Sequence, residues 1–304
     1  MLALLLAIAL AGEPPTAPTP AASTPATAAA TTVQGVTVTS RATPDRKRVA
    51  HFLGALSHPA GGQGQLARWP ANLAVCPQVL GVTPAATQAW TTRLQEVAAS
   101  VHLKVGRAGC EPNLRVIVAT HPDQAFAPLA KAMERDELDA RRSPADFRRF
   151  MARRDPVRWW RTVRTAPADG GVVLGYDQEV TTFRNDNSAS RMQLGSREVV
   201  SGVVVLVDAD QAKAANAKAL IDYIALGALA PVEASPTLGD PTTVLTLFTD
   251  LSAGHPPPSG MTPCDDAYLK ALYTVSPDNT YGVQETEMAR LMSRPGSGSN
   301  PICQ

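Results

Sequence analysis

The sequence lacks the short motifs that identify common catalytic sites. It contains no G-x-S-x-G nucleophile turn, no phosphate-binding loop and no glycine-rich dinucleotide turn. Serine is abundant, but no serine has a recognisable base partner in the sequence. We therefore assign no catalytic residue and favour a protein that is not an enzyme.

Histidine is scarce, and its spacing does not suit a metal site on a helix. Two imidazole ligands on one helix must lie one turn apart, at positions i and i+4. No two of the five histidines have this spacing: His51, His58, His102, His121 and His255. We therefore predict no metal site and no cofactor.

No apolar run in the sequence is long enough for a membrane span. The N-terminal run Leu2–Ala11 has about 10 residues, half of what a bilayer-spanning helix requires. Ala9-Leu10-Ala11 at its end matches the A-x-A pattern of signal-peptidase sites. The sequence therefore predicts a signal peptide over residues 1–11, a periplasmic or secreted protein, and no transmembrane span after cleavage.

Differences in amino-acid composition divide the rest of the chain into three segments. Residues 12–33 hold 5 Pro, 7 Ala and 6 Thr, a mixture that cannot bury apolar surface, so we interpret them as a disordered linker. Residues 34–293 are long enough for one well-buried globular domain, and residues 294–304 form a polar C-terminal tail. The net charge of +1 gives no global field for nucleic acid, and no partner is identified from it.

Four cysteines in an exported chain indicate two disulfides. Three pairings are possible. We favour Cys76–Cys110 and Cys264–Cys303, because partners that are near in sequence lose less loop-closure entropy. The alternative is a set of buried free thiols.

Hydrophobic periodicity predicts a single α+β domain with a small mixed sheet. The almost continuously apolar run Val199–Val207 is predicted as a central strand, and Ala212–Ala230 as the helix that follows it. From Ala219 onwards this helix carries one charge, Asp222, and a helix that is apolar all round lies inside a protein. Further strands are predicted at 33–39, 114–119 and 172–176, and further helices from Thr83-Pro84, Ser143-Pro144 and Thr262-Pro263 and over 283–292.

Three blocks of the sequence are similar to a secreted proteobacterial family of unknown function. The blocks are Cys76 with Arg93–Ala98 and Cys110–Leu114, then Val204–Asp208 with Asp222–Ala225, and finally Pro241–Phe248 with Met261–Tyr273. That family distantly resembles zincin-like metalloproteases, in which a helix carries an H-E-x-x-H or E-E-x-x-Q motif. The resemblance implies a zincin-like fold with this central buried helix.

The sequence departs from the metalloprotease pattern at the catalytic positions. Asp222 and Leu226 occupy the places of the two helix ligands, and Tyr223 occupies the place of the general base. Leucine cannot ligate zinc. The resemblance therefore implies a zincin-like shape with a degenerate catalytic helix.

Two short segments have alternative interpretations. Asp208-Ala209-Asp210 resembles part of a cation site, but a strand end followed by a helix N-cap is favoured. Ser259–Pro263 resembles the methionine turn beneath the zinc of metzincins, whereas a loop before a capped helix is favoured.

The segment Arg141–Arg164 holds nine arginines and two aspartates. Arginine beside tryptophan suits an anionic envelope component, and the alternative is a solvated helix face whose arginine stems cover apolar surface. The segment is expected to be largely exposed. The candidate contact residues are Arg148, Arg149, Arg153, Arg154, Arg158, Trp159 and Trp160.

Three functions remain open at this point. The favoured one is an exported, non-catalytic zincin-like domain that acts in binding or envelope structure. The second is a hydrolase whose active site is not recognisable in the sequence. The third is an envelope-surface binder that acts through residues 141–164.

The signal-peptide interpretation predicts the N-terminus of the exported protein. We expect cleavage near Ala11, because the apolar run ends there in an A-x-A pattern. Mass spectrometry of the extracytoplasmic protein should find an N-terminus near Gly12. Recovery of the chain from the cytosol with Met1 intact would contradict this prediction.

Overall fold

The computed structural model describes residues 46–59, 64–132, 144–168, 194–233 and 243–294. All of them belong to one compact unit, Arg41–Gln304. The predicted signal peptide, the linker, the C-terminal tail beyond Arg294 and two strands (33–39 and 172–176) lie outside the described residues.

The described strands form one mixed sheet. The strands are β1 (Pro77–Leu80), β2 (Leu114–Ala119), β3 (Val157–Pro167) and β4 (Ser196–Asp208), in the order β1-β2-β4-β3. Strands β1, β2 and β4 are parallel, and β3 runs antiparallel to β4. Because β4 lies inside the sheet and is packed on both faces, its sequence is a nearly continuous valine run. The predicted strand at 114–119 and the central strand around 199–207 are both confirmed.

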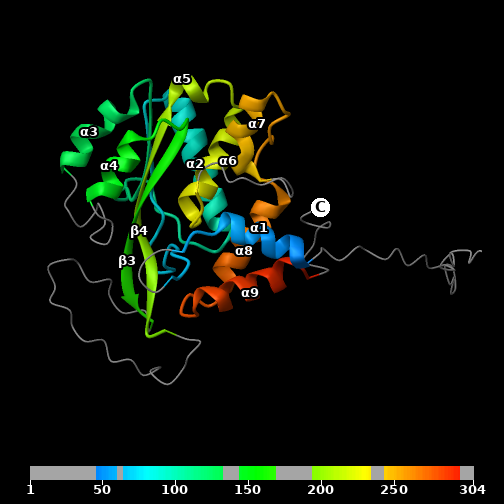
Figure 1. Cartoon of the computed structure of the whole chain (residues 1–304). Helices are drawn as coiled ribbons and strands as arrows, with labels where there is room; N and C mark the ends of the chain where they lie inside the picture. The colour runs from blue at the N-terminus through cyan, green and yellow to red at the C-terminus, as the bar shows by residue number, and fades with distance from the viewer. Residues whose placement is uncertain (1–45, 60–63, 133–143, 169–193, 234–242, 295–304) are drawn as a thin grey trace, which may run out of the picture. The chain divides into compact units, whose positions relative to one another are not determined.

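Helices cover both faces of this sheet. Figure 1 shows α2 and α6 on one side of the strands and α3 and α4 on the other, while α1, α8 and α9 form a neighbouring group. The described helices are α1 (Arg46–Leu56), α2 (Pro84–Ser100), α3 (Pro122–Ala132), α4 (Pro144–Ala152), α5 (Ala209–Ala212), α6 (Ala217–Leu229), α7 (Leu247–Ala253), α8 (Pro263–Thr274) and α9 (Tyr281–Met292), with a 3₁₀ turn at Val244–Thr246. The mixed α/β class with a small sheet is therefore confirmed.

Helix α2 begins where its sequence predicts. The Thr83 side chain accepts a hydrogen bond from the Ala86 amide, and Pro84 occupies the first turn, where its missing N–H is not needed. The apolar face buries Trp90, Leu94 and Val97 in the main core. This packing fixes α2 against α6 and β1.

The predicted helix 212–230 is buried as expected, but its predicted extent is wrong. The chain forms the short α5, leaves helical geometry, and starts again at Ala217. Asn216 caps the new helix by accepting a hydrogen bond from the Lys218 amide, a local bond that competes with a continuous helix. Every residue from Ala219 to Leu229 is buried, so α6 is the central helix of the core.

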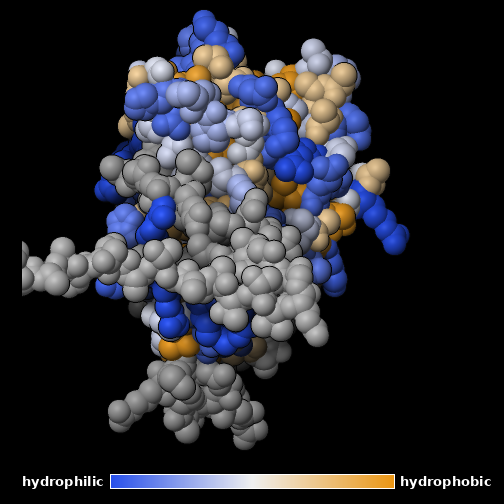
Figure 2. Space-filling model, turned by 90° about the vertical axis from the view of Figure 1, so that its right-hand side faces the viewer, coloured by the Kyte–Doolittle hydropathy of each residue, from blue (hydrophilic) through white to orange (hydrophobic). Residues whose placement is uncertain are grey.

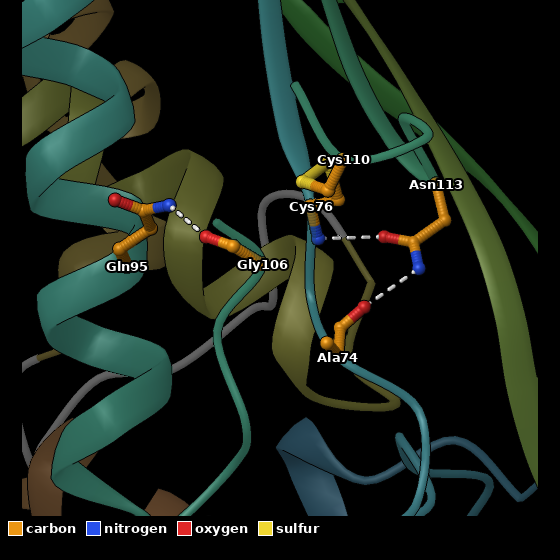
Figure 3. Close-up of a disulfide and its surroundings, with 6 residues drawn as sticks. All are labelled: Ala74, Cys76, Gln95, Gly106, Cys110 and Asn113. Carbon is orange, nitrogen blue, oxygen red and sulfur yellow. Dashed lines mark hydrogen bonds between the residues drawn. A yellow bond between two sulfur atoms is a disulfide. The ribbon is translucent and has the colours of Figure 1, made fainter. Parts of the chain in front are cut away.

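The predicted Cys76–Cys110 disulfide is confirmed, with the two Cα atoms 6.1 Å apart. It ties the segment entering β1 to the loop before β2 (Figure 3). Asn113 reinforces this link, because its side chain accepts from the Cys76 amide and donates to the Ala74 carbonyl, both at 2.8 Å. Cys264 is buried in α8, and its predicted pairing with Cys303 lies outside the described residues.

Helix α6 contacts β3 through a glycine. An added Cβ at Gly227 would lie 2.5 Å from the ring of Trp159, closer than real contacts allow. The Trp159 indole nitrogen donates to the Val232 carbonyl at 3.1 Å, so the ring is fixed in place. The close approach of α6 to β3 therefore requires glycine at this position.

This contact predicts the effect of adding one methyl group. Gly227→Ala should lower the free energy of unfolding by about 1–3 kcal/mol, because overpacking forces the ring or the helix to move. The measurement is chemical denaturation. Gly282→Ala in α9 is the matched control, since nothing lies within 4 Å of its added Cβ. Equal effects of the two substitutions would contradict the prediction.

Candidate functional site

Asp222 in α6 is the residue that the sequence resemblance aligns with the first metal-ligand position of a metalloprotease helix. Its side chain is 0% exposed. One carboxylate oxygen accepts from the Arg93 Nε at 2.7 Å. The other accepts from the Lys218 Nζ and from the Met261 amide, both at 2.8 Å. Three donors from three parts of the fold thus surround this carboxylate.

These hydrogen bonds control the ionisation of Asp222. Burial by itself raises the pKa of a carboxyl group. The donors Arg93, Lys218 and the Met261 amide outweigh burial and lower the pKa of Asp222 below its ordinary value. The group is therefore an ionised member of a salt-bridge network at neutral pH.

The other two positions of the degenerate motif belong to the hydrophobic core. Leu226 is completely buried. The Tyr223 ring packs between Trp159 and Phe248, at centroid distances of 5.7 and 5.2 Å. This side of α6 thus contributes packing surface rather than an open chemical site.

Both ambiguous segments cap helices. Asp208 accepts from the amides of Asp210 and Gln211 and starts α5. Thr262 and Asp265 form a reciprocal capping box at the start of α8. The favoured interpretations are therefore confirmed, and Met261 has one additional contact, its amide bond to Asp222.

The expectation that residues 141–164 are largely exposed is wrong for part of the segment. Residues 157–164 belong to β3, so Trp160 and Arg158 are only 1% and 2% exposed. Trp159 is half-buried against the main core. Sequence reasoning missed this strand because its buried arginines obscure the apolar pattern.

Several exposed arginines of the segment form ion pairs with neighbouring aspartates. Arg148, Arg149, Arg153 and Arg154 are all exposed. Three of them form ion pairs: Arg149 with Asp146, Arg153 with Asp155, and Arg154 with Asp123 of α3. Their surface is therefore less positive than the sequence indicates.

The buried arginines stabilise the fold. Arg158 pairs with Asp123 at the start of α3. Arg161 donates to the Gly227 carbonyl, through Nε at 3.1 Å, and to the Val232 carbonyl at 2.7 Å. A guanidinium near the C-terminal end of a helix complements carbonyl groups that lack helical partners. Arg161 therefore holds the end of α6 against β3.

A groove with a mixed polar and apolar lining lies on the sheet face that carries α3 and α4. It has a volume of about 410 Å³, and its lining includes Arg115 of β2, Thr162 and Arg164 of β3, and Gly202 of β4. The disulfide borders it at one end. Sequence reasoning did not find this groove, because its residues come from three strands that are distant in sequence.

The described surface has little exposed apolar area. Leu80 and Val105 are its exposed large hydrophobic side chains. On the face seen in Figure 2, hydrophilic residues cover much of the upper part, with smaller apolar areas between them.

Among the described residues, no helix is both long and apolar enough to cross a membrane. Nor are three His, Cys, Asp or Glu side chains of this part of the chain grouped as a metal site.

Comparison with known proteins gives no assignment. No protein-family model, no curated protein sequence and no solved structure matches the chain. The function must therefore be argued from the residues themselves.

The lowered pKa of Asp222 predicts a pH dependence of stability. A depressed carboxyl pKa stabilises the fold above the unfolded-state value of 3.8, and this contribution is lost as pH falls through the lower folded-state pKa. Asp222→Asn should reduce the free energy of unfolding by about 1–3 kcal/mol at pH 7, because charged hydrogen bonds are lost. The difference in the free energy of unfolding between Asp222→Asn and the wild type should shrink as pH falls below 3.8.

Denaturation at a series of pH values measures this difference. Asp266→Asn is the control, because Asp266 pairs with Lys270 on the surface and its side chain is 44% exposed. A difference between wild type and Asp222→Asn that does not change with pH would show that the carboxylate charge is unimportant.

Proposed function

We propose that this chain is an exported, non-catalytic binding domain with a zincin-like arrangement of sheet and central helix. The observation that carries the proposal is the environment of Asp222. Both of its oxygens accept hydrogen bonds from protein donors, and its charge is matched by Arg93 and Lys218. A carboxylate used in this way stabilises the fold and does not activate water.

The order of the elements supports the zincin-like part of the proposal. An antiparallel edge strand, β3, is followed by the inner strand β4 and then by the buried helix α6. The segment around Met261 then reaches back to α6 through the bond from its amide to Asp222. The resemblance implies a central buried helix of this kind, and here a salt bridge occupies the place where the family's helix would hold a metal.

Export is supported by the Cys76–Cys110 disulfide, because disulfides persist mainly in oxidising compartments. A periplasmic or secreted location fits the N-terminal apolar run. Binding through exposed arginines of residues 141–164 is less favoured, since aspartates pair with three of them.

Zinc analysis of the purified exported protein tests the proposal. After incubation with an equimolar amount of zinc and dialysis, we expect substoichiometric metal in the wild type, in Asp222→Asn and in the surface control Asp266→Asn. The physical reason is that Leu226 and Tyr223 supply no ligand beside Asp222. Stoichiometric zinc that is lost in Asp222→Asn and kept in Asp266→Asn would overturn the non-catalytic interpretation.

A further inference from the structure

The two faces of the sheet differ in how completely helices cover them. One face packs against α2 and α6 in the main core. On the other, α3 and α4 cover a small aromatic cluster that includes Ile117, Trp160 and Leu206. Two residues before Ile117 and Leu206, and two residues after Trp160 on the antiparallel β3, the same face presents Arg115, Val204 and Thr162, which line the groove. The groove therefore begins where the packing of α3 and α4 ends.

The floor of the groove is built by a β-bulge. Thr162 pairs with Gly202 and Val163 pairs with Val200, so Ser201 is the extra residue of β4. The Ser201 hydroxyl donates to the Thr162 carbonyl at 3.4 Å and accepts from the Arg164 Nε at 3.2 Å. Bulges re-aim side chains and often lie beside binding sites. This bulge directs the Ser201 hydroxyl towards Arg164, and the hydrogen bond between them positions the Arg164 side chain.

Gly202 leaves space on this floor. An added Cβ would meet the Asn113 carbonyl oxygen at 3.5 Å and the Thr162 hydroxyl at 4.0 Å, which are ordinary contact distances. A glycine inside a valine-rich central strand weakens the strand and allows a ligand to approach the backbone. Packing within the protein thus does not require glycine here, whereas a ligand on the strand would.

The charged groups of the groove are two arginines and one acid. Arg115 is partly exposed, and its side chain forms no hydrogen bond or ion pair with another described residue. Glu111 lies at the rim and is exposed, so water screens its charge. A second hollow of about 330 Å³ shares Leu73, Arg164 and Ser201 with the first. Their sizes suit a small molecule such as a sugar unit.

We propose that this groove binds a small ligand through an oxyanion, a carboxylate or a phosphate, held by Arg115 and Arg164. The planar guanidinium fork matches both oxyanions, and the Ser201 and Thr162 hydroxyls add neutral hydrogen-bonding groups beside it. The inference rests on the proposed binding function and names the ligand chemistry for it.

Titration of the full chain with two probes tests the inference. Inorganic phosphate and glucuronate represent the phosphate and the carboxylate, and the Gly202 amide and arginine Nε signals report binding in ¹H–¹⁵N spectra. We expect saturable shifts with at least one probe, and the tighter probe identifies the preferred oxyanion. Arg115→Gln should weaken this binding roughly tenfold or more, as expected for loss of a charged hydrogen bond.

Two further variants separate the groove from general charge effects. Gly202→Val keeps both arginines, suits a strand, and places methyl groups on the floor, so it should abolish binding while the folded spectrum is retained. Arg148→Gln removes an exposed arginine of α4 outside the groove and should change the dissociation constant by less than about twofold. Wild-type binding by Gly202→Val, equal weakening by Arg115→Gln and Arg148→Gln, or no saturable binding would overturn the inference.

The outcome is independent of the zinc test. Zinc bound through Asp222 would overturn the non-catalytic function and leave the groove result standing. A groove that binds neither probe, in a protein that also holds no zinc, would remove only the oxyanion inference.

Discussion

The buried carboxylate of Asp222 is the constraint on which much of the described structure depends. An ionised group inside a protein is costly unless several donors replace its water. Those donors come from α2, from the preceding turn of α6, and from the loop before α8. Moving any one of these segments would leave part of the charge unsatisfied, so the carboxylate fixes their relative positions.

The far end of α6 is held by a different set of interactions. Arg161 donates to the Gly227 and Val232 carbonyls, and the ring of Trp159 lies directly on the helix at Gly227. The guanidinium of Arg161 also stacks over the Trp159 ring at 5.4 Å. Arg161 of β3 is therefore part of the core, where it satisfies backbone carbonyls at and beyond the end of an apolar helix.

The two sheet faces consequently have different roles. Side chains on the face beside α6 are used in packing, and Tyr223 of α6 is an aromatic residue of this core, in contact with Trp159 and Phe248. The opposite face carries polar groups on β2, β3 and β4 that line the groove.

The sequence alone determined the features that depend on local pattern. The valine run of β4, the capped start of α2, the burial of α6 and the nearby Cys76–Cys110 pair all follow from composition and spacing. Tertiary structure alone decided the partners of Asp222, the strand character of residues 157–167 and the grouping of Arg115, Arg164 and Gly202. The physical reason is that these features join residues from separate strands and helices. The partner of a side chain across a sheet depends on strand register and packing rather than on its neighbours in the chain.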